Sequence, residues 1–167
     1  NLLEEDPRQV SVVRKLGFGK CRVALAIPKN ENYTGTEWLS GKKLATSYPN
    51  TLRNYLNSKN INAEIHEISG SVEIAPNIGL ADGICDIVST GSTLFKNGLK
   101  EVEHLFTSEA VLIAGNNISA EAKQILDKLV FRINAVLAAR NNKYILLNAP
   151  NDKLDQIIAQ LPGMKSP

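Results

Sequence analysis

Short apolar segments alternate with helix-like segments along this chain, and this alternation constrains the fold more than any other feature. Residues 22–27 form an apolar run that ends at Pro28, and residues 84–88 form a second run of the same kind. Such runs are typical of strands that are buried on both faces of a sheet. Strands that run in the same direction need a crossover, which is usually a helix. We therefore predict an α/β fold with a mostly parallel sheet.

The spacing of apolar residues predicts further elements around these two strands. Leu52, Tyr55 and Leu56 lie at positions i, i+3 and i+4, which predicts a helix over 49–59 whose first turn accommodates a proline. Strands are expected at 43–47, 62–68 and 144–147, one or two strands at 102–113, a helical turn at 35–39, and helices at 71–78, after 93, at 120–140 and at 153–160.

Charge and cysteine content restrict the classes of partner and compartment. Lysine and arginine number 19 against 17 acidic residues, so the net charge is only +2. This balance argues against a protein that binds nucleic acid through a broad basic surface. No apolar run approaches the roughly 18 residues of a membrane span, so we expect no membrane partner either. Cys21 and Cys85 lie in separate apolar segments and are expected to be unpaired thiols, which fits a cytoplasmic protein.

Residues 89–93 are the stretch most typical of a ligand site. They follow a predicted buried strand and open a helix, and ligands of open α/β sheets bind just past the carboxyl ends of strands. Free amides at a helix start, hydroxyl donors and a glycine that permits close approach suit a phosphate. An ordinary Ser/Thr helix cap with a turn glycine is the alternative. The candidate phosphate-binding residues are Ser89, Thr90, Gly91, Ser92 and Thr93.

Four further side chains are candidates to line the same cleft. Asp86 lies inside the predicted strand, where a carboxylate is costly unless it is paired or faces a polar site. Beside a phosphate loop it holds ribose hydroxyls or the water shell of a metal; the alternative is a salt-bridged or edge aspartate. Glu73 faces the cleft or solvent, Tyr48 stacks on a base or packs in the fold, and Arg22 contacts an anion or joins a surface ion pair. These alternatives stay open on the residues alone.

A set of short motifs extends over nearly the whole chain. They are Phe18–Arg22, Leu44–Pro49, Gly70–Pro76, Gly79–Leu94, Asn97–Leu99, and Leu161–Gly163 with Ser166–Pro167. In this order and spacing they resemble the ATP phosphoribosyltransferases, the first enzymes of histidine biosynthesis, and most closely the long, self-regulated form. Each motif alone is weak, but the set is highly specific.

This resemblance implies a two-lobed fold like that of type II periplasmic binding proteins. It implies a glycosyltransferase that joins N1 of ATP to C1 of phosphoribosyl pyrophosphate and releases pyrophosphate, with Mg²⁺ as cofactor. Thr90 to Thr93 would cradle the 5′-phosphate, and Asp86 would face the ribose. The complete enzyme would be a cytoplasmic homo-oligomer, from dimer to hexamer, with histidine as its allosteric feedback inhibitor.

The resemblance also implies how the chain divides. Most of the family's first lobe would precede Asn1, and the histidine-binding regulatory domain would follow Pro167, so we expect a segment of a longer protein. Residues 1–20 would be the end of the first catalytic lobe and a hinge, 21–108 the second lobe, and 109–167 the return segment of the first lobe. We expect the segment alone to be inactive. The alternative function is a non-enzymatic solute- or anion-binding protein of the same fold, because a fold does not fix function.

Overall fold

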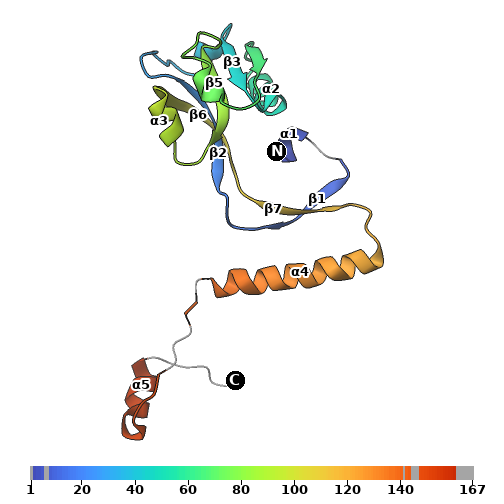
Figure 1. The fold of residues 1–167 in the computed structure, drawn as a ribbon, viewed down its shortest axis with the longest axis vertical. Coiled ribbons are helices and arrows are strands. Elements are labelled where there is room, and N and C mark those ends of the chain that lie inside the picture. The colour runs from blue at the N-terminus through green and yellow to red at the C-terminus, as the bar shows by residue number, and fades with distance from the viewer. Residues whose placement is uncertain (1, 6–7, 141, 144–146, 161–167) are drawn as a thin grey trace. The chain divides into compact units, whose positions relative to one another are not determined.

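The computed structural model describes residues 2–5, 8–140, 142–143 and 147–160 (Figure 1). Its larger sheet has five strands in the order β4-β3-β5-β2-β6. The strands are β2 (Cys21–Pro28), β3 (Lys43–Thr46), β4 (Glu64–Glu67), β5 (Gly83–Val88) and β6 (Leu99–Ser108).

Strand direction confirms the α/β class and the mostly parallel sheet. β3 pairs in parallel with β4 and β5, whereas β2 pairs antiparallel with both β5 and β6. Four strands of this sheet therefore run in one direction, and β2 lies between two of them in the opposite direction. The sequence pattern predicted this strand at 22–27 but not its direction, because a strand buried on both faces gives no signal of its direction.

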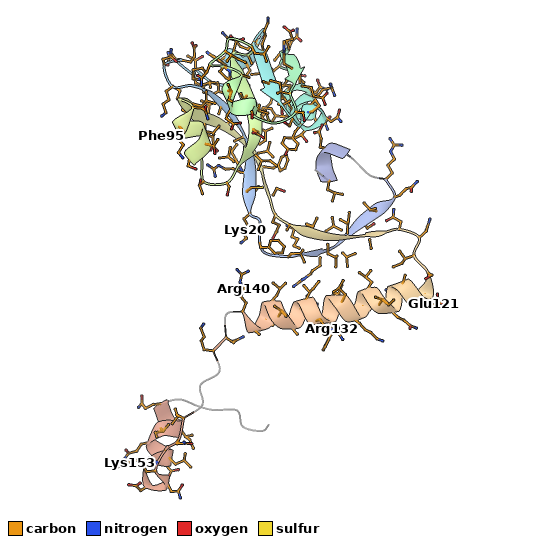
Figure 2. The ribbon with its side chains drawn as sticks, in the orientation of Figure 1. Lys20, Phe95, Glu121, Arg132, Arg140 and Lys153 are labelled. Atoms are coloured by element: carbon orange, nitrogen blue, oxygen red, sulfur yellow. The ribbon has the colours of Figure 1, made fainter. Side chains whose placement is uncertain are left out.

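Helices cover both faces of this sheet and give a three-layered lobe. Along β2, Val23 and Leu25 pack with α2 (Pro49–Ser58), and Ala24 and Ala26 pack on the other face with α3 (Ser92–Lys96). Pro49 occupies the first turn of α2, as expected. Figure 2 shows Phe95 on the outer side of α3, whereas the preceding residue, Leu94, is buried in the core.

A second, two-stranded sheet pairs β1 (Val10–Lys15) with β7 (Val111–Gly115) in antiparallel fashion. The expected strand region at 102–113 thus forms two strands, β6 and β7. β1 was not predicted, because five of its six residues are exposed and its partner lies about 100 residues away in the sequence. It therefore lacks the apolar periodicity that marks a buried strand.

Several shorter elements correct or complete the prediction. The helix expected at 71–78 is only the 3-10 turn η2 (Val72–Ile74), which follows Ser71 in the left-handed region at φ 51°. The expected turn at 35–39 is η1 (Thr36–Leu39), and α1 (Leu2–Glu5) lies near the N-terminus. The predicted strand at 144–147 falls largely outside the described residues.

The chain divides into two units, residues 1–126 and 127–167. The long helix α4 (Ala120–Ala139) confirms the prediction at 120–140, and η3 (Asn151–Lys153) and α5 (Leu154–Gln160) follow it. All residues of α4 are described, and none is buried; Figure 2 shows side chains projecting along its whole length, from Glu121 to Arg132 and beyond. No helix in the described ranges is both long and apolar enough to cross a membrane.

Candidate functional site

The parallel strands bring the candidate residues to one edge of the sheet. Because β3, β4 and β5 run in the same direction, their carboxyl ends share an edge. Tyr48 follows β3, Glu73 lies in the turn after β4, and residues 89–93 follow β5. Arg22 joins them from the amino end of the antiparallel β2, where it pairs with Val88. Segments far apart in the sequence therefore converge at this edge.

The segment 89–93 turns sharply from β5 into α3. Gly91 is the N-cap of α3 and adopts the left-handed region at φ 79°, which glycine accepts without steric cost. The hydroxyl oxygens of Thr90 and Ser92 lie 3.0 Å apart, and the Ser92 amide donates a long bond of 3.4 Å to Thr90 Oγ1. The side chains of these two residues and of Thr93 are exposed. The loop thus presents hydroxyl groups and first-turn amides to solvent.

The short length of α3 changes one part of the sequence argument. α3 has only five residues, so its dipole adds little to the attraction of an anion. Of the plain helix-cap alternative, only the turn glycine is present: Gly91 is the N-cap and makes no side-chain cap hydrogen bond, and the long bond from the Ser92 amide to Thr90 Oγ1 lies before the cap. What suits the loop to a phosphate is therefore its exposed donors and the close backbone approach that a glycine permits.

Arg22 forms an ion pair and also contacts the loop. Its Nε lies 2.8 and 2.9 Å from the two carboxylate oxygens of Glu101, and its Nη2 lies 2.7 Å from Oε2. Its Nη1 donates to the backbone carbonyl of Ser89 at 3.1 Å. The hydrogen bonds to Glu101 raise the pKa of Arg22 above its usual value. Of the two alternatives, the ion pair is the one that the structure shows.

Asp86, Tyr48 and Glu73 are electrostatically coupled at the same edge. Burial raises the pKa of Asp86 above its ordinary value of 3.8; a hydrogen bond from the Ile87 amide opposes this, and the charge of Glu73 adds to it. Burial, and next the charge of Asp86, raise the pKa of Tyr48. Among the described residues no cation pairs with Asp86, and a half-buried carboxylate of this kind is expensive for folding; such groups gather at functional sites.

Sequence reasoning missed two residues that shape this edge. Glu101 holds Arg22, and Glu4 of α1 accepts hydrogen bonds from the amides of Asn50 and Thr51 at 2.8 and 2.7 Å, at the start of α2. Burial raises the pKa of Glu4, but the hydrogen bonds from these amides lower it, and the pKa ends below its ordinary value. Both glutamates bond to partners more than 40 residues away in the sequence. The one local sign of such a role was that Glu101 is an acidic residue in a strand that is partly apolar.

The opposite edge of the sheet holds a hollow of about 420 Å³ that contains none of the predicted site residues. There the Asp82 carboxylate accepts from the Lys43 amide at 2.8 Å and lies 4.0 Å from Lys42 Nζ. The lining residues are Pro28, Glu31, Lys43, Pro76, Gly79, Ala81 and Asp82. Its size alone does not make it the better site, because Asp82, one of its two acidic residues, already has hydrogen-bond and ionic partners.

The two cysteines are free and lie on separate strands, as expected. Cys85 is buried in β5, and burial raises the pKa of its thiol to about 12. Such a thiol is a structural, unreactive group.

Comparison with known proteins places this geometry in a family. A model of the HisG family, ATP phosphoribosyltransferase, matches residues 1–161. The chain is 56% identical over its whole length to the ATP phosphoribosyltransferase of Bacteroides thetaiotaomicron, covering 59% of that protein. It is 58% identical over 98% of its length to the enzyme of Parabacteroides distasonis, covering 58% of that protein. The chain thus spans somewhat more than half the length of these curated relatives.

Solved structures agree with the fold. The ATP phosphoribosyl transferase (HisG:HisZ) complex from Thermotoga maritima superposes with a TM-score of 0.70 at 28% identity, over 82% of this chain and 66% of that one. An ancestral arginine-binding protein superposes with a TM-score of 0.57 at 18% identity, over 96% of this chain and 67% of that one, which shows a shared fold alone. The expected likeness to periplasmic binding proteins is thereby confirmed. With a family match over nearly all of its residues, this chain belongs to the ATP phosphoribosyltransferase family.

Proposed function

We propose that this chain carries the phosphoribosyl pyrophosphate-binding lobe of an ATP phosphoribosyltransferase. Residues 21–108 form that lobe, and residues 1–20 and 109–167 belong to the other catalytic lobe. The observation that carries the proposal is the exposed loop 89–93 at the carboxyl end of β5, beside the half-buried Asp86. The family membership supplies the identity of the substrate, which the geometry alone does not.

In the proposed reaction, N1 of ATP attacks C1 of the ribose and pyrophosphate leaves. No side chain of the protein acts as a nucleophile, so the protein contributes orientation and stabilisation of charge. The hydroxyls of Thr90, Ser92 and Thr93, with the amides of the loop, hold the 5′-phosphate. Asp86 accepts hydrogen bonds from the ribose hydroxyls, and Tyr48 and Glu73 line the same cleft.

The donor set at this edge fits Mg²⁺ that is bound mainly through the substrate. Asp86 and Glu73 offer carboxylate oxygens, and no group of three or more His, Cys, Asp or Glu residues that suits a metal occurs in the described part of the chain. Mg²⁺ usually keeps several waters and takes one or two carboxylates together with phosphate oxygens. When bound, the ion neutralises charge on the pyrophosphate.

The whole protein is proposed to be a cytoplasmic homo-oligomer that histidine inhibits by feedback. Support for oligomeric assembly comes from the Thermotoga maritima relative, which is a complex of two kinds of chain. The two free thiols fit a reducing compartment.

Calorimetric titration of the 167-residue chain tests the proposal. Phosphoribosyl pyrophosphate with Mg²⁺ is compared with a panel of amino acids and with inorganic phosphate and sulfate. We expect saturable binding of phosphoribosyl pyrophosphate and no binding of amino acids. Binding of an amino acid instead would favour the solute-binding alternative and overturn the proposal.

Activity gives a second test on the same sample. With one lobe forming only one wall of the cleft, the adenine is not oriented, and loss of orientation removes several kcal/mol of barrier lowering. We therefore expect no formation of phosphoribosyl-ATP by this chain alone. Efficient turnover would show that residues outside this chain are not needed, which would contradict the proposed division into lobes.

A further inference from the structure

The guanidinium of Arg22 lies against the turn formed by residues 89–91. Its Nη1 donates to the Ser89 carbonyl at 3.1 Å, where β5 ends. A Cβ atom placed on Gly91 would lie 3.8 Å from Arg22 Nη2, within ordinary van der Waals contact. One rigid planar group therefore bonds to the first residue of the loop and lies beside the position that a side chain at residue 91 would occupy.

Glu101 fixes the orientation of that guanidinium. The carboxylate accepts three of the four hydrogen bonds made by Arg22, at 2.7 to 2.9 Å, from strand β6. The side chains of Arg22 and Glu101 are 33% and 26% exposed, so water competes only partly for these bonds. Fork-like pairing of arginine with a carboxylate restricts geometry more than a lysine pair does.

The same pairing offsets the positive charge of Arg22 next to the loop. An arginine that served chiefly to attract a phosphate would bind better without a carboxylate at 2.7 Å. Three bonds to Glu101 and one to a backbone carbonyl instead suit a group that holds the backbone in place.

We propose that Glu101 is a positioning residue, which acts through Arg22 to hold the loop 89–93 in the conformation that binds a phosphate group. The identity of the ligand in this inference rests on the proposed function. The contact between Arg22 and the loop is independent of that function. In the alternative, Arg22 itself binds the anion, and the charge of Glu101 weakens that binding. The two alternatives predict opposite signs for the same substitution.

Glu101→Gln separates them, because it keeps the shape of the side chain and removes its charge. The affinity of the 167-residue chain for phosphoribosyl pyrophosphate with Mg²⁺ is measured by calorimetry at two salt concentrations. Positioning predicts about tenfold weaker binding, the loss typical of a hydrogen bond to a charged group, with an unchanged salt dependence. Equal or tighter binding, or a steeper salt dependence, would overturn the proposal.

Arg22→Lys provides a second variant in case Glu101→Gln does not fold. It keeps the positive charge and loses the planar fork, so positioning predicts weaker binding here as well. Wild-type affinity in Arg22→Lys would assign the role to charge alone and would overturn the proposal. Glu109→Gln is the matched control, because Glu109 forms the surface pair with Lys15 at 3.4 Å away from the loop. We expect it to bind as the wild type does.

Backbone relaxation of the ligand-free chain keeps this test independent of the proposed function. The positioning role predicts that Glu101→Gln and Arg22→Lys increase the mobility of amides 89–91, whereas Glu109→Gln does not. If the wild type fails to bind phosphoribosyl pyrophosphate but these amides loosen, the proposed function is wrong and the positioning contact stands. If the amides keep wild-type mobility in both variants, the positioning contact is wrong whatever the ligand is.

Discussion

The two edges of the five-stranded sheet differ in how their polar groups are satisfied. At the hollow edge, Asp82 pairs with Lys42 and with a backbone amide, and Gly83 packs tightly between strands. At the loop edge, Asp86 is half-buried with a raised pKa, and the hydroxyls of residues 89–93 face solvent. One edge contributes to stability, whereas the other keeps groups that cost stability and suit a ligand. The presence of a hollow is therefore a poorer guide to the site than exposed donors and a half-buried carboxylate are.

The largest expected effect is on binding at the loop edge. Thr90→Val and Thr93→Val keep the side-chain shape and remove one donor each. Each should weaken binding of phosphoribosyl pyrophosphate about tenfold to a hundredfold, because a hydrogen bond to a charged group contributes roughly 1.5–3 kcal/mol. Thermal melts should change little, since both side chains are exposed. Unchanged affinity in both variants would reduce the loop to an ordinary helix cap.

Gly83→Ala at the hollow edge should show the reverse behaviour. A Cβ atom there would lie 3.1 Å from the Ala26 carbonyl oxygen and 3.2 Å from Ile27 Cγ2, closer than normal packing allows. We expect a net loss of about 1–2 kcal/mol in the free energy of unfolding, measured in urea. This net value allows for the opposing gain from alanine, which lowers the conformational entropy of the unfolded chain. Affinity for phosphoribosyl pyrophosphate should stay unchanged. A loss of binding without a loss of stability would remove the distinction between the edges.

Asp86→Asn should produce a small gain in stability. Because the folded state raises the pKa of Asp86, its stabilising contribution is complete below pH 3.8 and is lost as the pH rises through the folded pKa. At pH 7 the ionised carboxylate therefore opposes folding, and asparagine removes that cost. The melting temperature should exceed that of the wild type at pH 7 and match it near pH 3, while binding weakens. Asp152→Asn in η3 serves as the exposed control.

Local sequence patterns were enough to predict most strands and helices of the larger sheet and the position of the loop. The strands at 22–27 and 84–88 and the helices at 49–59 and 120–140 are encoded by spacing within a few residues, and the structure confirms them. β1 escaped prediction because its exposed residues pair with β7, about 100 residues later.

The site residues likewise divide into those that a local pattern marks and those that depend on distant partners. A strand, a glycine and hydroxyl residues in sequence marked the loop, whereas the role of Arg22 depends on Glu101, 79 residues away. No local pattern distinguishes an arginine that meets an anion from one that meets a carboxylate. Only the register of β2 against β5 and β6 brings these groups together.

The central claim is that the loop 89–93 is where this chain binds the phosphate of its substrate. Amide chemical shifts of the 167-residue chain, followed during titration with phosphoribosyl pyrophosphate and Mg²⁺, test it most directly. We predict that the largest saturable shifts occur at residues 89–93, with smaller ones at Asp86 and Tyr48. Shifts centred on Lys43 and Asp82 at the hollow edge, with none at 89–93, would contradict the claim.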